Sequence, residues 1–145
     1  GHQGSEARAV RLDSQGDISS NPRQLVWQLH RDTPYVPSPL LYGDLLFFTK
    51  SNTAVLTCLN AGTGKPLTQS VRIPELQTLY TSPAGAAGRI YFTSREGTTV
   101  VIKNQAEFEV LATNKLADGI DASPAIVGRQ MFLRGHRNLY CLAEE

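Results

Sequence analysis

The stretch Ser123-Pro124-Ala125-Ile126-Val127-Gly128-Arg129-Gln130-Met131-Phe132-Leu133 has two earlier counterparts in the same chain. One is Ser38-Pro39-Leu40-Leu41-Tyr42-Gly43-Asp44-Leu45-Leu46-Phe47-Phe48, and the other is Ser82-Pro83-Ala84-Gly85-Ala86-Ala87-Gly88-Arg89-Ile90-Tyr91-Phe92. In every copy an aromatic residue stands eight positions after the proline, with a large apolar residue on each side of it. The prolines, at positions 39, 83 and 124, are 44 and 41 residues apart. A fixed period of this length predicts an array of one supersecondary unit.

Three positions mark each unit: a serine, the proline after it, and the aromatic residue. The serines are Ser38, Ser82 and Ser123, the prolines are Pro39, Pro83 and Pro124, and the aromatic residues are Phe47, Tyr91 and Phe132. The serines have no His or Asp partner at a matching repeat position, so the sequence gives no support for nucleophilic catalysis. We expect their hydroxyls to form hydrogen bonds with the backbone of a neighbouring unit.

Each complete unit reads as four short strands separated by glycine-containing or polar turns. The strand after Ser-Pro ends at Gly43, Gly88 or Gly128, and the next strand carries the aromatic residue. A polar hairpin and two further strands follow in the complete units. Four short strands in every 41 to 44 residues are typical of a β-propeller blade. The sequence therefore predicts an all-β fold: a partial β-propeller of four-stranded antiparallel blades, with about three blades plus part of another.

The repeat also gives the bounds of the units. Residues 1–8 are predicted to be a disordered or tag-proximal start, and residues 9–33 the back half of a blade, in which the strand 9–13 aligns Leu12 with Leu59. Complete blades are predicted at 34–76 and 77–117, and three strands of the terminal blade at 118–145. Closed propellers usually have about four to eight blades. We therefore expect a C-terminal fragment with exposed sheet edges, through which two or more copies associate.

Composition limits the classes of function. The chain has 145 residues, a hydrophobic fraction of 41% and a formal net charge of +1. This hydrophobic fraction predicts a packed core, and the near-zero net charge argues against nucleic-acid binding. The longest apolar runs are about five residues, which is too short for a membrane span. No signal peptide is visible in the sequence.

Residues 56–65, Leu-Thr-Cys-Leu-Asn-Ala-Gly-Thr-Gly-Lys, complete the pattern of the first full unit. With the Ser-Pro, glycine and aromatic strand before them, they resemble the PQQ-like repeat of quinoprotein-type, WD40-like β-propellers, over about residues 7–145. Trp27 stands where that repeat places its closing tryptophan, whereas the second unit lacks Thr-Gly-Lys. The sequence is similar to the C-terminal part of planctomycete-like bacterial propeller proteins. Because such proteins are commonly exported, the resemblance implies an exported or periplasmic location.

The resemblance implies a scaffold rather than an enzyme. Quinoprotein dehydrogenases hold pyrroloquinoline quinone beneath a disulfide of adjacent cysteines, beside a calcium ion bound by Glu, Asn and Asp. The two cysteines here, Cys58 and Cys141, are far apart in sequence. We therefore expect a non-catalytic propeller with no cofactor site, which binds a protein, a peptide or another ligand. The alternatives are a fragment of a quinoprotein-like enzyme whose catalytic residues lie in missing blades, and a subunit of the outer-membrane assembly lipoprotein type.

Few residues suggest a site. Cys58 and Cys141 hold the same place in different units, too far apart for a disulfide, so both are predicted to be small buried strand residues. The histidines are isolated, and no metal site is predicted. Arg129, Arg134 and Arg137 form the main basic cluster together with His136. This cluster is a candidate anion-binding site, and a solvated hairpin is the other interpretation.

Overall fold

The computed structural model describes residues 6–18 and 21–143. Strands dominate these residues, and one short 3₁₀ helix, η1 (Pro22–Gln24), precedes the second strand. The strands are β1 (Ala7–Val10), β2 (Leu25–Leu29), β3 (Leu40–Tyr42), β4 (Leu45–Thr49), β5 (Val55–Asn60), β6 (Pro66–Arg72), β7 (Ala84–Ala86), β8 (Arg89–Thr93), β9 (Thr98–Lys103), β10 (Val110–Lys115), β11 (Ala125–Val127), β12 (Gln130–Arg134) and β13 (Leu139–Ala143).

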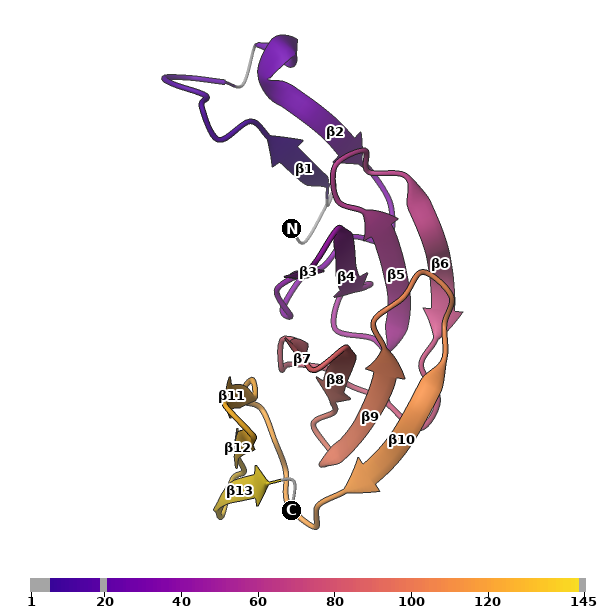
Figure 1. Cartoon of the computed structure of the whole chain (residues 1–145), viewed down its shortest axis with the longest axis vertical. Coiled ribbons are helices and arrows are strands. Elements are labelled where there is room, and N and C mark those ends of the chain that lie inside the picture. The colour runs from indigo at the N-terminus through magenta and orange to yellow at the C-terminus, as the bar shows by residue number, and fades with distance from the viewer. Residues whose placement is uncertain (1–5, 19–20, 144–145) are drawn as a thin grey trace.

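These strands form separate antiparallel sheets, each built from consecutive strands. The sheets are blade 1 (β1–β2), blade 2 (β3–β6), blade 3 (β7–β10) and blade 4 (β11–β13). They follow one another along a curved arc, with β3, β7 and β11 on its concave side and β6 and β10 on its convex side (Figure 1). The predicted all-β propeller class is confirmed, and blades 2, 3 and 4 lie within the residue ranges 34–76, 77–117 and 118–145.

A tight hairpin connects the two inner strands of blades 2, 3 and 4. Gly43, Gly88 and Gly128 have φ values of 64°, 72° and 58°, in the left-handed region that glycine adopts without steric cost. These turns fix the register, so that Leu40 faces Phe47, Ala84 faces Tyr91 and Ala125 faces Phe132. The aromatic residue of each repeat therefore occupies the same place on the same face of its blade.

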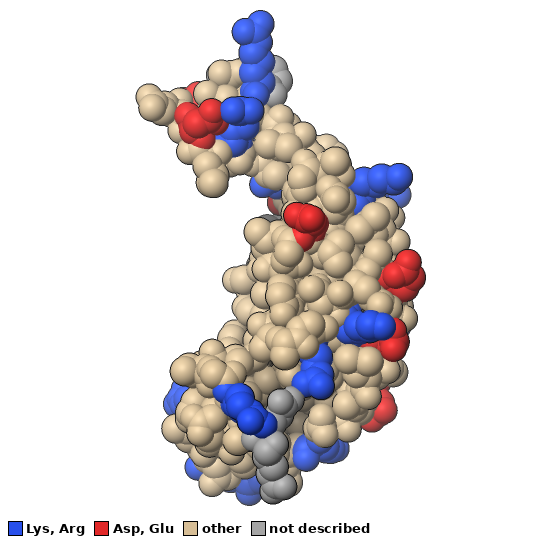
Figure 2. Space-filling model, in the orientation of Figure 1, with Lys and Arg blue, Asp and Glu red and all other residues tan. Residues whose placement is uncertain are grey.

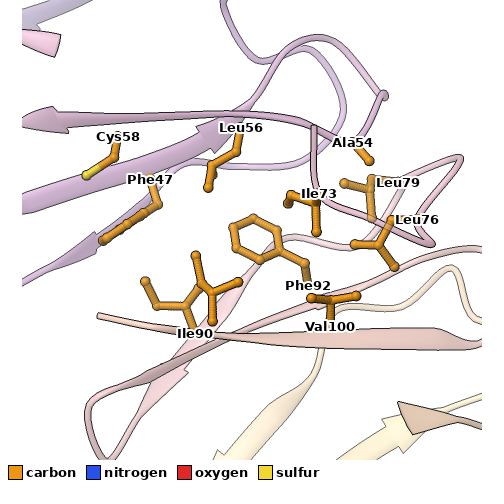
Figure 3. Packing of buried hydrophobic residues seen from close by; sticks show 11 residues of the cluster. Phe47, Ala54, Leu56, Cys58, Ile73, Leu76, Leu79, Ile90, Phe92 and Val100 are labelled. Atoms are coloured by element: carbon orange, nitrogen blue, oxygen red, sulfur yellow. The ribbon is translucent and has the colours of Figure 1, made fainter. Parts of the chain in front are cut away.

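The main core lies between blades 2 and 3. Phe47, Leu56 and Cys58 of blade 2 face Ile90 and Phe92 of blade 3, and all are buried (Figure 3). Alternation along the strands turns one face of each blade toward its predecessor and the other toward its successor. Burying a side chain of this size contributes about 1.5–3 kcal/mol. The repeat therefore forms its core between blades rather than within one.

The segment that leads into a blade links two successive hairpins. Leu79 N–H donates to Asn52 of blade 2 at 2.9 Å, while the carbonyl of Thr78 accepts from Arg95 N–H of blade 3 at 2.9 Å. The next blade repeats this pattern: Ile120 N–H donates to the carbonyl of Arg95 at 3.0 Å, and His136 N–H donates to Gly119 at 2.8 Å. Leu79 and Ile120 are both buried, so each connecting segment packs between two neighbouring blades.

Blade 1 differs from the sequence prediction. Its first strand is Ala7–Val10 rather than 9–13, because the chain turns after Arg11, whose N–H makes the last bond of the pair, to the carbonyl of Gln24 at 3.0 Å. Val10, not Leu12, therefore stands at the level of Leu59, and Leu12 is exposed in the turn. Of the predicted disordered start at 1–8, residues 7 and 8 belong to β1, where they pair with Leu29 and Gln28. Residues 1–5 lie outside the described residues.

Candidate binding surfaces

The repeat serines form a ladder between blades, as the sequence predicts. Ser38 N–H donates to Ser82 Oγ at 3.0 Å, and Ser82 N–H donates to Ser123 Oγ at 2.8 Å. Each serine precedes the inner strand of its blade, so the ladder joins the same point of blades 2, 3 and 4. The expected hydroxyl-to-backbone contacts are confirmed. Among the described residues, the ladder has two open ends, the hydroxyl of Ser38 and the N–H of Ser123.

Blade 4 presents an apolar face that corresponds to the core face of blade 2. We call it the terminal face; its apolar residues are Ala125, Val127, Phe132, Leu139 and Cys141, and Arg134, which pairs with Leu139, lies on the same face. The equivalent residues of blade 2 are Leu40, Tyr42, Phe47, Leu56 and Cys58, which pack against blade 3. No further blade covers the terminal face within residues 6–18 and 21–143. Leu139 is accordingly 72% exposed, whereas Leu56 is 1% exposed.

A second apolar surface lies between blades 3 and 4, which we call the outer groove. Two cavities of about 280 and 300 Å³ occur there, and Tyr91, Met131 and Leu142 line both. A third, of about 440 Å³, is lined by Arg89, Tyr91, Val101, Leu111 and Ala112 of blade 3. The groove is open because blade 4 has three strands in the described part of the chain, while blades 2 and 3 have four.

Charged side chains gather on the hairpins. Arg95 Nε lies 3.0 Å from Asp121 Oδ1, and His136 Nε2 lies 3.0 Å from Asp121 Oδ2. The guanidinium of Arg95 also lies 4.9 Å from the centre of the Tyr80 ring, in cation–π geometry. Arg95 and His136 hold equivalent places on successive hairpins, so one carboxylate connects blades 3 and 4. All three side chains remain partly solvated, which limits the strength of these contacts.

Asp118 lies in the segment that connects blades 3 and 4, and its side chain binds the β12–β13 hairpin. Its carboxylate accepts hydrogen bonds from the backbone N–H of Arg137 (3.2 Å) and of Asn138 (3.1 Å), and from the Tyr140 hydroxyl (3.2 Å). Burial raises the pKa of this carboxyl, but the bonds from Arg137, Tyr140 and Asn138 outweigh burial and bring the pKa below its usual value. A cavity of about 470 Å³ beside it is lined by Glu96, Lys115, Leu116, Ala117, Asp118, Gly119, His136 and Arg137.

The predicted basic cluster is spread along blade 4. Arg129 lies in the β11–β12 turn and Arg134 at the far end of β12, roughly 17 Å away for a strand of this length. Arg137 contacts the Asp118 carboxylate, with Nε 3.6 Å from Oδ1, and donates to the carbonyl of Ala117. The structure therefore places Arg134 and Arg137 on the same hairpin and separates Arg129 from them. Over the face shown in Figure 2, basic and acidic side chains are interspersed.

The cysteines differ in environment although they are equivalent in the repeat. Both are free thiols. Cys58 is buried, and burial raises the pKa of its thiol to about 11. Cys141 is exposed on the terminal face, so the prediction that both are buried is wrong for Cys141. Both strands carry the pattern Leu-x-Cys-Leu, but blade 3 covers Cys58 and no blade in the described part of the chain covers Cys141.

Some of these contacting residues could have been identified from their positions in the repeat. Tyr80 and Asp121 both stand two positions before the repeat serine, and Arg95 and His136 share a hairpin position. Asp118 carries no such signal, because its partners come about twenty residues later in the chain. Across the described residues, no group of three or more His, Cys, Asp or Glu side chains could hold a metal ion, and no helix is long and apolar enough to cross a membrane.

The antiparallel blades, their common register and the contacts between them define a partial β-propeller. No family model matches the chain, and no curated protein matches it. The fold is instead recognised among solved structures. The likeness to these structures is one of fold, because the sequence identity is 9% in each of the three described below.

Two of these structures are of computationally designed proteins. This chain aligns with Ika8 over 73% of its length at a TM-score of 0.57, and with Ika4 over 83% at a TM-score of 0.59. The third is BamB from Moraxella catarrhalis, a β-propeller, with 81% of this chain aligned at a TM-score of 0.51. The chain spans 32% of the length of Ika8, 72% of Ika4 and 48% of BamB.

Proposed function

We propose that this chain is a non-catalytic β-propeller scaffold that binds protein through its terminal face. The contrast between two equivalent strands carries the proposal: Leu139 is 72% exposed, while Leu56, in the same Leu-x-Cys-Leu pattern, is 1% exposed. Large uncovered apolar surfaces mark interaction sites in soluble proteins. The equivalent surface of blade 2 is the core interface with blade 3, so the apolar residues of the terminal face correspond to those of a blade-to-blade contact.

A second copy of the chain is the partner that this surface fits. Blade 1 has two strands in the described part of the chain, and Leu41 on the inner part of blade 2 is 61% exposed. Phe48 and Leu59 on the same face are buried, so only the inner part of blade 2, beside β3, is open to contact the terminal face of another copy. The open ends of the serine ladder match this arrangement, because the N–H of Ser123 then meets the hydroxyl of Ser38 in the other copy. A head-to-tail contact of this kind forms a ring when its rotation closes.

Solution mass and thiol reactivity test this association together. Light scattering over a concentration series is expected to show dimers or larger closed assemblies, and alkylation of Cys141 is expected to slow as they form. Cys58 is the internal control, because its burial keeps it unreactive in both states. Val127→Lys, which places a charge on the terminal face, is expected to give monomers. Val110→Lys, at an exposed position of β10, is the matched control and is expected to associate normally.

A monomer at high concentration, with Cys141 alkylated at the same rate throughout, would exclude association through this face. The scaffold role also predicts that pyrroloquinoline quinone and calcium leave the chain unchanged. Neither is expected to shift its thermal unfolding or to produce a bound chromophore. A saturable spectral change would instead favour a segment of a quinoprotein-like enzyme. An exported or periplasmic location, and anion binding by Arg129, Arg134 and Arg137, stay predictions of the sequence.

A further inference from the structure

Asp118 and Gly119 form the one Asp-Gly pair of the sequence, and no Asn in it is followed by glycine. In a flexible chain, the backbone nitrogen of the residue after an aspartate can attack the side-chain carboxyl carbon and close a five-membered succinimide ring. Glycine favours this reaction, because it has no Cβ to obstruct the ring and its backbone adopts the necessary conformation easily. This pair is therefore the position at which an aspartate of the chain is most prone to react.

The structure accounts for both residues of the pair. The side chain of Asp118 is 1% exposed, and it accepts hydrogen bonds from two backbone N–H groups of the β12–β13 hairpin (3.2 and 3.1 Å) and from the Tyr140 hydroxyl (3.2 Å). Gly119 lies against the imidazole of His136. A Cβ there would lie 2.6 Å from Nδ1, so a larger residue would displace the ring from Asp121. A reactive pair is thus a consequence of the contacts that hold the hairpin.

Hydrogen bonds and close packing fix the backbone on both sides of the pair. Leu116 N–H donates to the carbonyl of Gly97 at 3.0 Å, and the carbonyl of Gly119 accepts from His136 N–H at 2.8 Å. Gly97 packs directly on this segment, since a Cβ there would lie 2.3 Å from the carbonyl oxygen of Asp118. Closing a succinimide ring requires the backbone and side chain of Asp118 to rotate. These contacts oppose that rotation as long as the hairpin is in place.

The ionisation of Asp118 protects the pair in the same direction. Ring closure expels a carboxyl oxygen as water, which is far easier from a protonated carboxyl than from an ionised carboxylate. Burial raises the pKa of Asp118, but the hydrogen bonds from Arg137, Tyr140 and Asn138 outweigh burial and bring the pKa below its usual value. The side chain is therefore ionised at neutral pH in the folded chain. Geometry and charge together make the folded pair unreactive.

We propose that Asp118-Gly119 is a site of spontaneous isomerisation, which the fold suppresses and which reacts when the β12–β13 hairpin detaches. The backbone nitrogen of Gly119 then bonds to Cγ of Asp118, and the carboxyl OH leaves as water with the amide proton. Water next adds to the ring. Addition at Cγ restores aspartate, whereas addition at the backbone carbonyl carbon breaks its bond to nitrogen and leaves an isoaspartyl link. The reaction needs no oxidant or other reactant, and the mass of the chain is unchanged.

The isoaspartyl link prevents the hairpin from returning to its place. The main chain now passes through the former side-chain carbon, which adds one carbon atom between Asp118 and Gly119. The carbonyl of Gly119 then cannot meet His136 N–H while the carboxylate stays on the hairpin. An open state that is chemically modified does not refold, so a local opening becomes irreversible. The site goes beyond the proposed function, because it limits the lifetime of blade 4 whatever that blade binds.

Isotope labelling measures the reaction in the intact 145-residue chain. The chain is incubated at neutral pH in heavy-oxygen water, folded or in guanidinium chloride, and is then digested with trypsin in ordinary water. Residues 116–129 form one tryptic peptide, in which Asp121, followed by Ala122, is an internal control for Asp118. In denaturant, heavy oxygen and isoaspartate are expected at Asp118 and not at Asp121. The folded chain is expected to react at least about tenfold more slowly, because its hairpin is open for less than about a tenth of the time.

A single hydroxyl tests whether the contacts of the hairpin give this protection. Tyr140→Phe removes one hydrogen bond to the carboxylate and is expected to speed isomerisation in the folded chain but not in denaturant. Tyr91→Phe, which removes a hydroxyl from the outer groove, is the matched control and is expected to react like the wild type. Equal rates in folded and denatured chains, no preference for Asp118 over Asp121, or a folded Tyr140→Phe chain that reacts like the wild type would overturn the proposal. So would an isoaspartyl chain whose β12–β13 amides regain their protection from hydrogen exchange.

Discussion

Trp27 Nε1 donates a hydrogen bond to the carbonyl of Ala61 at 2.7 Å, and this bond fixes blade 1 to the turn of blade 2. The indole ring lies over Gly64, whose φ is 68°. Gly64 therefore satisfies two demands at once, since the turn needs a left-handed residue and the ring leaves no room for a Cβ. Blade 1 has two strands in the described part of the chain, and Asp32, just after β2, adds contacts with Lys50 and Ser70 of blade 2.

Trp27→Ala is expected to detach blade 1 while blades 2 and 3 stay folded. The variant loses a half-buried aromatic side chain and one hydrogen bond, a local cost of about 2–3 kcal/mol. Hydrogen exchange should accelerate in β1 and β2 and stay unchanged in β5 and β9. Trp27→Phe, which keeps the ring contact without the N–H, should fall between the two. Equal acceleration in β9 would show that blade 1 is not an independent unit.

The serine ladder predicts different effects for two chemically identical substitutions. Ser82→Ala removes the acceptor of the Ser38 N–H and is expected to lower stability by about 1 kcal/mol. Ser38→Ala is the matched control: no hydrogen bond to its hydroxyl occurs among residues 6–18 and 21–143, so the isolated chain should keep its stability. Urea unfolding at low protein concentration compares the two. Equal losses would mean that the hydroxyls act through something other than the ladder.

The features that recur in each blade could be predicted from the sequence. Ser82, Tyr91 and Trp27 could be placed because the contacts they make repeat with the period of the chain, so a match in sequence implies a match in environment. Exposure could not be predicted in this way. Cys58 and Cys141 share a strand pattern, yet one is buried and the other exposed, because burial depends on the next blade rather than on the strand.

The unpredicted features depend on contacts without a local signal. The end of β1 is set by Arg11 and Gln24, which lie across a long turn, so the alternating residues up to Asp13 gave the wrong boundary. Asp118 stands in a segment that reads as an ordinary turn. Its role follows from Tyr140 and the 135–138 hairpin, which come later in the chain and form no recognisable motif with it.

Asp118 should make the chain sensitive to acid. Its pKa is lower in the folded protein than in the unfolded chain, so its contribution to stability is present above the unfolded value and is lost as the pH falls through the folded value. Asp32 acts in the same direction, because its hydrogen bond from Lys50 lowers its pKa. Stability is therefore expected to fall as the pH drops below about 4, the usual value for aspartate.

Asp118→Asn isolates this contribution. The amide cannot replace a carboxylate that accepts from two backbone N–H groups and a hydroxyl, so the variant should be less stable at pH 7 and lose less stability in acid. The remaining acid dependence is expected from Asp32. Thermal unfolding from pH 7 to pH 3 measures both effects, with Asp44→Asn, an exposed turn position, as the control. If the wild-type chain and Asp118→Asn lose stability in parallel, the carboxylate is not what holds the β12–β13 hairpin.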